Sequence, residues 1–422
     1  MSILFIDRQK PFTSIVAGIA LHSLATIFRY ISGSEVIYAI ICLIGWGYVI
    51  SGIYKLKLKS KLKVGKGYGS LIIMYMLLCL IMIIRGYLID YPYPWNSFMG
   101  MINFHLFVPT YILAFLMPLV SFIPPSDFDF RCIAKWSIVF SYITVFTLVF
   151  FGRDMLIVSA IKVIGGDVDA GGDTYKYYGL IYSNVALVSL CSALVSKKVW
   201  RINTIGLLCA LLINLICARR GDSAILTMIF ILDLVFYTKT KRGLSKFMTK
   251  AFLGSVLIFG VVLFINASAF RYIRERGMND NRSAVDNALM AQMDPMEKWV
   301  GKGLNGRYYF NLHQKNDPYG GWRYLSETGY YYLVLRGGYI LTWLYIIIIL
   351  TPAFNGIFKS KNQLCKALGT IMIISIVQLI PFGHLTFNLS FLIIWSGVRL
   401  CMSRQIRLMS NKQITEKYFL DA

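Results

Sequence analysis

The most informative feature of this 422-residue sequence is how little charge it carries. Charged residues make up only 15% of the chain, whereas 57% of its residues are apolar. A soluble domain needs a charged shell of about a quarter of its residues, so this composition excludes a soluble enzyme, a disordered chain and a secreted disulfide scaffold. The mean hydropathy is +0.62, and the apolar runs are long rather than short and alternating. These features predict a polytopic all-α membrane protein and argue against a β-barrel.

Several sequence patterns of known sites are also missing. The eight cysteines lie in or beside apolar runs and form no CxxC pair, so neither a zinc site nor a disulfide framework is indicated. The sequence contains no HExxH and no GxSxG motif, which leaves zincin and serine-hydrolase chemistry without support. We therefore predict no metal and no cofactor.

Apolar runs of about 20 residues, the length that spans a bilayer, predict about twelve transmembrane helices. They lie at about residues 12–30, 35–54, 68–89, 104–123, 134–152, 178–196, 202–218, 222–237, 251–270, 329–351, 367–382 and 385–402. This divides the chain into nine spans (1–270), a large extracytoplasmic loop (271–328), three further spans (329–402) and a cytoplasmic tail (403–422).

The net charge of +23 sets the predicted orientation. It arises from 43 Lys and Arg against 20 Asp and Glu, and the basic residues concentrate in segments such as 55–66 and 238–250. These segments fall on one side of the membrane if all twelve spans exist, and the positive-inside bias makes that side the cytoplasm. The charge therefore needs no nucleic-acid partner, and the large loop faces outward.

Basic residues on the outer side run against this bias and need another explanation. Arg85 and Arg336 lie inside apolar runs near the outer surface. Guanidinium groups bind phosphate through two parallel hydrogen bonds, so the set indicates an anionic substrate such as a lipid pyrophosphate. The alternative is that these side chains bind phospholipid head groups or pair with acidic residues of the loop. The substrate-binding candidates are Arg219, Arg220, Arg282, Lys302, Arg307 and Arg323.

Two further patterns mark the large loop. Tyrosines and tryptophans crowd the region 299–332, and they are typical either of an aromatic belt at the membrane interface or of a surface that stacks on sugar rings. The glycine-rich segment 301–307 (GKGLNGR) predicts a turning backbone whose N–H groups could hold an anion. It lacks the GK[ST] ending of a Walker A loop.

Candidate catalytic residues are few. Glu327 stands where the chain re-enters the membrane, and desolvation there would raise its pKa into the range of a general base; the alternative is an interface ion pair with the arginine four residues earlier. His313 is the only histidine of the large loop. His384 lies in the outer turn between the last two predicted spans, and His105 is expected to pack within a helix.

Three patches carry a family resemblance. The first is 217–224 (CARRGDSA), where an apolar helix ends before the next span. The second is Asn281-Arg282-Ser283 followed by the glycine-rich segment, and the third is 322–329 (WRYLSETG), the return into the membrane. In order and spacing the sequence resembles the bacterial O-antigen polymerase and O-antigen ligase superfamily of inner-membrane glycosyltransferases. The ligases usually carry a histidine on the re-entering segment; its absence here favours the polymerase branch.

The resemblance implies a reaction on the outer face of the bacterial inner membrane. A growing glycan would pass from undecaprenyl pyrophosphate to a sugar hydroxyl of a lipid-linked repeat unit, without metal or nucleotide. Arg219 or Arg220 together with Arg282 would bind pyrophosphate, and Glu327 or His313 would supply the base, with Glu327 preferred. Implied partners are the lipid-linked oligosaccharide, membrane lipids and, as an optional partner, a chain-length regulator. Under the resemblance, Arg307 and Arg323 would hold either lipid-linked substrate.

Other functions remain open at this point. An O-antigen ligase would use the same donor. A lipid-linked oligosaccharide flippase would need cations for the same substrate, but such transporters usually show two related halves, and no repeat is visible. A membrane acyltransferase and a scaffold protein are the remaining alternatives.

Overall fold

The computed structural model describes residues 10–32, 34–59, 68–88, 103–163, 186–216, 220–239, 282–310, 321–326, 328–380 and 383–419. Almost all of these residues lie in helices. They are α1 (Pro11–Ser32), α2 (Glu35–Lys59), α3 (Tyr68–Leu88), the π-helix η1 (Asn103–Phe107), α5 (Ile112–Leu116), the 3₁₀-helix η2 (Met117–Phe122), α6 (Phe130–Val163), α8 (Ala186–Leu190), α9 (Lys197–Ile216), α10 (Arg220–Lys239), α13 (Arg282–Ala291), α14 (Pro295–Val300), α15 (Gly329–Phe358), α16 (Gln363–Gln378), α17 (Leu389–Met402), α18 (Arg404–Leu408) and α19 (Asn411–Tyr418). Within these ranges the only strands are β1 (Tyr308–Tyr309) and β2 (Trp322–Arg323), which pair antiparallel.

Seven helices in the described part are long and apolar enough to cross a membrane. They are α1, α2, α3, α6, α9, α10 and α15, and each coincides with a predicted span. The shorter apolar segments 112–122, 363–378 and 389–402 overlap three more. The predicted span 251–270 and the first part of 178–196, residues 178–185, lie outside the described residues. The rest of the latter span contains only the short helix α8, followed by a turn. The all-α membrane protein is therefore confirmed, and the number of twelve spans stays a prediction.

The helix α2 shows how such a protein is apolar on its outside. Val36, Leu43 and Ile50 are spaced seven residues apart and are 68%, 57% and 61% exposed, a stripe that lipid chains would cover. The opposite face packs tightly against α1, because a Cβ added to Gly18 would overlap the carbonyl oxygen of Gly45. Small residues that let two backbones approach are typical of helix packing in membranes.

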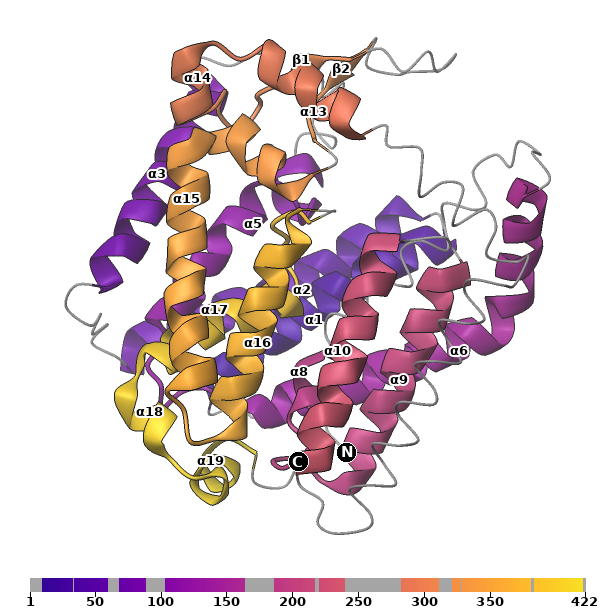
Figure 1. The fold of residues 1–422 in the computed structure, drawn as a ribbon. Helices are drawn as coiled ribbons and strands as arrows, with labels where there is room; N and C mark the ends of the chain where they lie inside the picture. The colour runs from indigo at the N-terminus through magenta and orange to yellow at the C-terminus, as the bar shows by residue number, and fades with distance from the viewer. Residues whose placement is uncertain are drawn as a thin grey trace.

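The bundle has two chemically different ends. The hairpin end consists of residues 282–326 (α13, α14, β1 and β2), and the tail end consists of residues 404–419 (α18 and α19). Figure 1 shows them at opposite ends of α15. Near the tail end, the buried carboxylate of Asp129 pairs with Lys10 at 3.2 Å and with Arg131 at 2.6 Å. Burial by itself would raise the pKa of Asp129, but these two cations lower it overall.

Two apolar segments are interrupted instead of forming continuous helices. The first break is at 108–111 between η1 and α5, and the second is at Gly338 of α15, with φ 68°. We name these two breaks, together with the turn that connects α16 and α17, the junction. The helix α15 still matches the predicted span 329–351 in length and apolarity, whereas the predicted span 104–123 is divided at 108–111. Hydropathy depends only on which residues are apolar, so it cannot predict where the backbone leaves the helical conformation.

The break at Gly338 is stabilised by the glycine-rich segment. The backbone N–H of Lys302 donates to the carbonyl of Leu335 at 2.7 Å, and that of Gly303 donates to the carbonyl of Arg336 at 3.0 Å. The last carbonyls of a helix lack intrahelical donors, and here the loop supplies them. The hairpin end and the membrane helix α15 are therefore joined by backbone hydrogen bonds.

Candidate functional site

The break at 108–111 contacts both the turn between α16 and α17 and the first half of α15. The backbone N–H of Phe387, between α16 and α17, donates to the carbonyl of Pro109 at 2.8 Å. The hydroxyl of Tyr332, in the first half of α15, donates to the carbonyl of Thr110 at 2.8 Å. Irregular backbone within a membrane is tolerated where its polar groups find partners in the protein or line a cavity, and broken helices are typical of substrate sites. The junction is therefore the first place to look for a function.

Arg336 is the most unusual side chain of the junction. It is only 1% exposed, and its Nη2 donates to the carbonyl of Tyr324 at 2.8 Å. Its guanidinium carbon lies 5.5 Å from the centre of the Tyr332 ring. Its Nε and Nη1 have no hydrogen-bond acceptor among the described residues, which also offer it no carboxylate. A buried charge without a counter-charge is strongly destabilising, so this site suits an anion.

His384 lies beside this arginine. It belongs to the connection between α16 and α17, and its ring centre is 4.9 Å from that of Tyr332. Burial and, secondly, the positive charge of Arg336 lower the pKa of His384 to about 4. The imidazole is therefore neutral at physiological pH, and it contacts α15 through the Tyr332 ring. A neutral imidazole can exchange a proton or a hydrogen bond with a bound substrate.

A second histidine lies near the same end, at η1. The hydroxyl of Tyr87 is 2.8 Å from Nδ1 of His105, and the His105 ring stacks on Tyr111 with centres 5.7 Å apart. The Tyr111 hydroxyl in turn donates to the side chain of Asn305, whose Nδ2 donates to the carbonyl of Gly86 at 2.8 Å. His105 is thus one link of a polar chain that fixes the glycine-rich segment to α3, as well as a packed residue.

Lys302 and the amides around it are engaged within the protein. The Lys302 ammonium donates to the carbonyl of Gln292 at 2.9 Å and lies 3.5 Å from the carboxylate of Glu297. The N–H of Leu304 donates to the carbonyl of Met82 at 3.2 Å, in addition to the two bonds with α15 given above. These N–H groups serve carbonyls and do not form the anion cradle that the glycine pattern favoured.

Arg85 differs from Arg336, although the sequence presents both in the same way. Its Nη1 and Nη2 donate to the carbonyls of Val300 and Gly301, both at 3.1 Å. The guanidinium therefore caps the end of α14 and ties it to α3. Positive charge at the C-terminal end of a helix is stabilising there. Arg85 holds the hairpin end in place, and Arg336 is left as the buried guanidinium with unused donors.

The two strands separate Arg307 and Arg323. Tyr309 pairs with Trp322 across the strands, and Tyr308 pairs with Arg323; paired residues share a face. The guanidinium of Arg307 lies 4.4 Å from the centre of the Trp322 ring, next to the exposed ring of Tyr309. On the other face Tyr308 is fully buried, with Arg323 beside it. Arg307 with its two aromatic neighbours thus forms an outward, cationic and aromatic surface, which we name the hairpin surface.

Asp286, which the sequence analysis did not single out, organises the return of the chain into the membrane. It is 7% exposed, and it accepts hydrogen bonds from Ser326, at 2.7 Å, and from Thr328. These two residues flank Glu327, the predicted base, which itself lies outside the described residues. In the sequence, Asp286 is marked only by its place in the polar loop between the apolar residues Val285 and Leu289. In the structure these two residues are buried on the same short helix.

The remaining predicted site residues are only partly visible. Glu327, His313 and Arg219 lie outside the described residues. Arg220 begins α10 and Arg282 begins α13, but their side chains are not among those described. Arg282 begins the hairpin end, and Figure 1 shows the start of α10 directed toward the same side of the bundle, at some distance from β1 and β2. Lys302, Arg307 and Arg323 all lie in the hairpin end, but Arg307 and Arg323 are on opposite faces of the strand pair and Lys302 contacts Gln292 and Glu297.

Comparison with known proteins adds no relative. No protein-family model matches the chain, and no curated protein and no solved structure matches it significantly.

Proposed function

We propose that this protein is an oligosaccharide repeat-unit polymerase of the bacterial inner membrane. It transfers a growing glycan from undecaprenyl pyrophosphate to a sugar hydroxyl of a lipid-linked repeat unit, in the synthesis of O-antigen or a related surface polysaccharide. The observation that carries the proposal is Arg336, a guanidinium 1% exposed with two nitrogens unbonded among the described residues, beside the break of α15 and the turn between α16 and α17. A lipid pyrophosphate brings both a di-anion and an apolar tail to such a place.

The protein contributes to this reaction mainly by positioning the two substrates and by stabilising the charge of the leaving group. The acceptor hydroxyl oxygen attacks the anomeric carbon of the donor sugar, and the bond from that carbon to the pyrophosphate oxygen breaks. The electron pair leaves with the pyrophosphate, and the hydroxyl proton passes to a base. A fixed guanidinium stabilises the charge that grows on the leaving group more than the charge of the ground state. We assign this role to Arg336, supported by Arg282 and by Arg219 or Arg220.

The hairpin surface suits the glycan. Aromatic rings present flat apolar faces to sugar rings, and Tyr309 and Trp322 are 45% and 38% exposed. Arg307, held over the Trp322 ring, adds hydrogen-bond donors at the edge of the same surface. In this proposal the junction binds the pyrophosphate and the hairpin surface binds sugar units farther from the reaction. Glu327, placed between two residues bonded to Asp286, is the proposed base.

The orientation follows from the charge at the opposite end. Lys55, near the end of α2, lies close to the start of α1, 3.4 Å from Ser14, and begins the lysine-rich segment 55–66. The basic helix α18 lies at this end as well. The positive-inside bias favours the cytoplasm for it, which places the hairpin end and the junction outside.

An O-antigen ligase is the second candidate, and one observation favours it. The ligases carry a histidine on the segment that re-enters the membrane, and the sequence 322–329 has none. In the structure, however, His384 contacts Tyr332 of that segment from another element. A histidine is therefore present beside the segment that re-enters the membrane, although it comes from another element.

The decisive experiment is a gel of surface polysaccharide from a strain in which the gene is deleted. For a polymerase, we expect the ladder to collapse to a single repeat unit on its final carrier. Wild type should restore the ladder, and Arg336→Gln should leave it collapsed. Arg336→Lys should restore it only in part, because an ammonium cannot form two parallel hydrogen bonds with phosphate as a guanidinium does. Long chains stranded on undecaprenyl pyrophosphate would instead identify a ligase, and an intact ladder in the deletion strain would refute the glycan proposal.

A matched control separates loss of the site from loss of the fold. Arg153 on α6 is exposed, and Arg153→Gln removes the same charge far from the junction, so it should behave as wild type. The amount of each variant in the membrane is measured in parallel. If Arg336→Gln restores a full ladder at wild-type abundance, the assignment of the pyrophosphate to Arg336 is wrong.

A further inference from the structure

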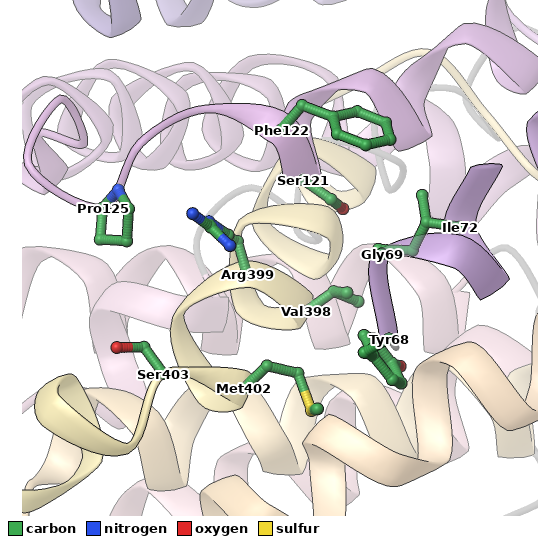
Figure 2. Close-up of a pocket in the computed structure, with 10 residues that line it drawn as sticks. All are labelled: Tyr68, Gly69, Ile72, Ser121, Phe122, Pro125, Val398, Arg399, Met402 and Ser403. Carbon is green, nitrogen blue, oxygen red and sulfur yellow. The ribbon is translucent and has the colours of Figure 1, made fainter. Parts of the chain in front are cut away.

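A second site lies near the tail end, away from the junction. A cavity of about 310 Å³ opens between the first turn of α3, the end of η2 and the last turns of α17. Figure 2 shows Arg399 among the residues that surround it, with the guanidinium extending toward Pro125. Nothing in the proposed glycan transfer uses this cavity, because it lies at the other end of the bundle.

The lining combines one cation with apolar walls. Arg399 is the only charged residue among the described residues that line the cavity. Ile72 of α3, Phe122 of η2 and Val398 of α17 supply apolar surface, and the hydroxyl of Ser403 lies at the rim. A single guanidinium beside apolar walls is complementary to a ligand with one anionic group and a hydrocarbon part.

The position of the cavity selects the kind of ligand. Tyr68, on its wall, is the first residue of α3 and follows the lysine-rich segment 55–66, and the basic helix α18 begins at Arg404, directly after Ser403. Basic segments at the membrane edge attract anionic lipids of the cytoplasmic leaflet. The first turn of α3 adds the positive end of a helix dipole to the same wall. The sequence on both sides of the cavity is therefore basic, which suits an anionic lipid head group.

We propose that this cavity binds one anionic glycerophospholipid of the cytoplasmic leaflet. Its phosphate pairs with Arg399, and the upper part of an acyl chain lies along Ile72, Phe122 and Val398. The lipid thereby fills the space between α3, η2 and α17 and links three elements that are far apart in the sequence. This proposal is independent of the glycan reaction and holds for any function of the outer end.

Native mass spectrometry of the full-length protein in detergent tests the proposal. Dioleoyl-phosphatidylglycerol and dioleoyl-phosphatidylcholine are titrated separately, and we expect the anionic lipid to be retained more strongly. Arg399→Gln should weaken phosphatidylglycerol binding by about five- to tenfold, as expected for the loss of one phosphate–arginine pair at a membrane surface. Arg399→Lys should keep most of the preference.

The control and the contrary outcomes are equally concrete. Arg404, five residues along the chain, is exposed, and Arg404→Gln should bind phosphatidylglycerol as wild type does. Equal retention of the two lipids, or equal loss in the Arg399 and Arg404 variants, would overturn the site. If millimolar inorganic phosphate displaces the lipid from wild type and binds in its place, the ligand is a soluble phosphate and the lipid assignment is wrong. A variant that does not survive detergent is replaced by Val398→Trp, which fills the cavity and should also exclude the lipid.

Discussion

The carbonyl oxygen of Arg336 lies directly against Gly301. A Cβ added at Gly301 would overlap that oxygen, and Gly301 has φ 73°, a backbone conformation that glycine adopts without strain. The neighbouring Gly303 donates its N–H to the same carbonyl. The backbone of the arginine that we assign to pyrophosphate is thus positioned by a glycine of the outer loop. The side chain of Arg336 is assigned to substrate binding, whereas its main-chain carbonyl contacts the glycine-rich segment.

We expect Gly301→Ala to damage both stability and activity. With φ 73° and ψ 176°, Gly301 lies in a region that is essentially restricted to glycine, and an alanine there costs about 1–3 kcal/mol. The overlap with the Arg336 carbonyl must in addition be relieved by moving α15 or α14. Thermal unfolding in detergent should show a lower Tm, and chain elongation should fall with it. Gly47 offers the control, because a Cβ there meets no atom within 4 Å. Gly47→Ala should change stability by no more than about 1 kcal/mol, in the stabilising direction. Equal effects of the two variants would show that the contact between Gly301 and the Arg336 carbonyl does not matter for stability.

Inorganic pyrophosphate should stabilise the protein through Arg336. A ligand that binds only the folded state raises stability in proportion to the logarithm of its concentration, and the unused guanidinium nitrogens would gain acceptors. The Tm of wild type should therefore rise with pyrophosphate, whereas that of Arg336→Gln should not. In an assay with lipid-linked repeat units, the same variant should lose about 100-fold or more in rate, the usual cost of removing one charge-stabilising donor.

Glu327 has two alternative roles, as an ion-pair partner of Arg336 or as the base, and pyrophosphate binding distinguishes them. If Arg336 is paired with Glu327 in the unliganded protein, Glu327→Gln should raise the affinity for pyrophosphate, since it frees the guanidinium. If Glu327 is only the base, that variant should abolish turnover and leave pyrophosphate stabilisation unchanged. The two measurements together separate the two roles of this carboxylate.

His384 predicts a defined pH dependence of stability. Its pKa is lowered to about 4 in the folded protein, against about 6.5 in an unfolded chain. Between these values the unfolded state binds a proton that the folded state does not, so His384 contributes stability above pH 6.5 that is lost as the pH falls toward 4. Unfolding of His384→Gln should be less sensitive to pH in this window than that of wild type. Identical pH profiles of unfolding for wild type and His384→Gln would show that His384 does not cause the pH dependence. Bound pyrophosphate, which offsets the Arg336 charge, should raise the pKa of His384.

Asp286→Ala should loosen the segment that carries the proposed base. The change removes the acceptor of Ser326 and Thr328 at once, and hydrogen bonds to a charged group are worth roughly 1.5–3 kcal/mol each. Limited proteolysis of sealed right-side-out vesicles should then cleave residues 321–328 faster, and chain elongation should decline. Asp154 on α6 is exposed, and Asp154→Ala serves as the control. Unchanged cleavage in Asp286→Ala would show that the two hydroxyls do not depend on this carboxylate.

The sequence predicted the long helices well and the broken ones poorly. The stretch 68–89 is uniformly apolar and long enough to span a bilayer, so length and composition determine α3 almost to its ends. The segment 104–123 is just as apolar, yet its helix is interrupted because Pro109 and Thr110 give their carbonyls to Phe387 and Tyr332. Those donors are more than 200 residues away in the chain. No local pattern contains that information.

The same limit applies to the candidate site. Glycine spacing predicted correctly that 301–307 turns sharply, but the partners of its amides are carbonyls of α15, and so the anion cradle did not follow. Arg85 and Arg336 look alike in sequence, each within an apolar run, and only the structure distinguishes a guanidinium bonded to α14 from one with unused donors. The resemblance of 322–329 to a known family drew attention to this return segment, and Asp286, which organises it, carries no motif.

The contacts between α3 and the glycine-rich segment also set an order of assembly during synthesis. Arg85 bonds carbonyls 215 and 216 residues further along the chain, and Gly86 accepts from Asn305, 219 residues away. The ribosome must therefore complete most of the protein before the upper end of the third helix finds its partners. Until then Arg85 is an unpaired charge near the edge of the bilayer, exposed to quality-control proteases. Nascent chains truncated before residue 300 should be short-lived, and a chain arrested beyond residue 340 should already protect α3.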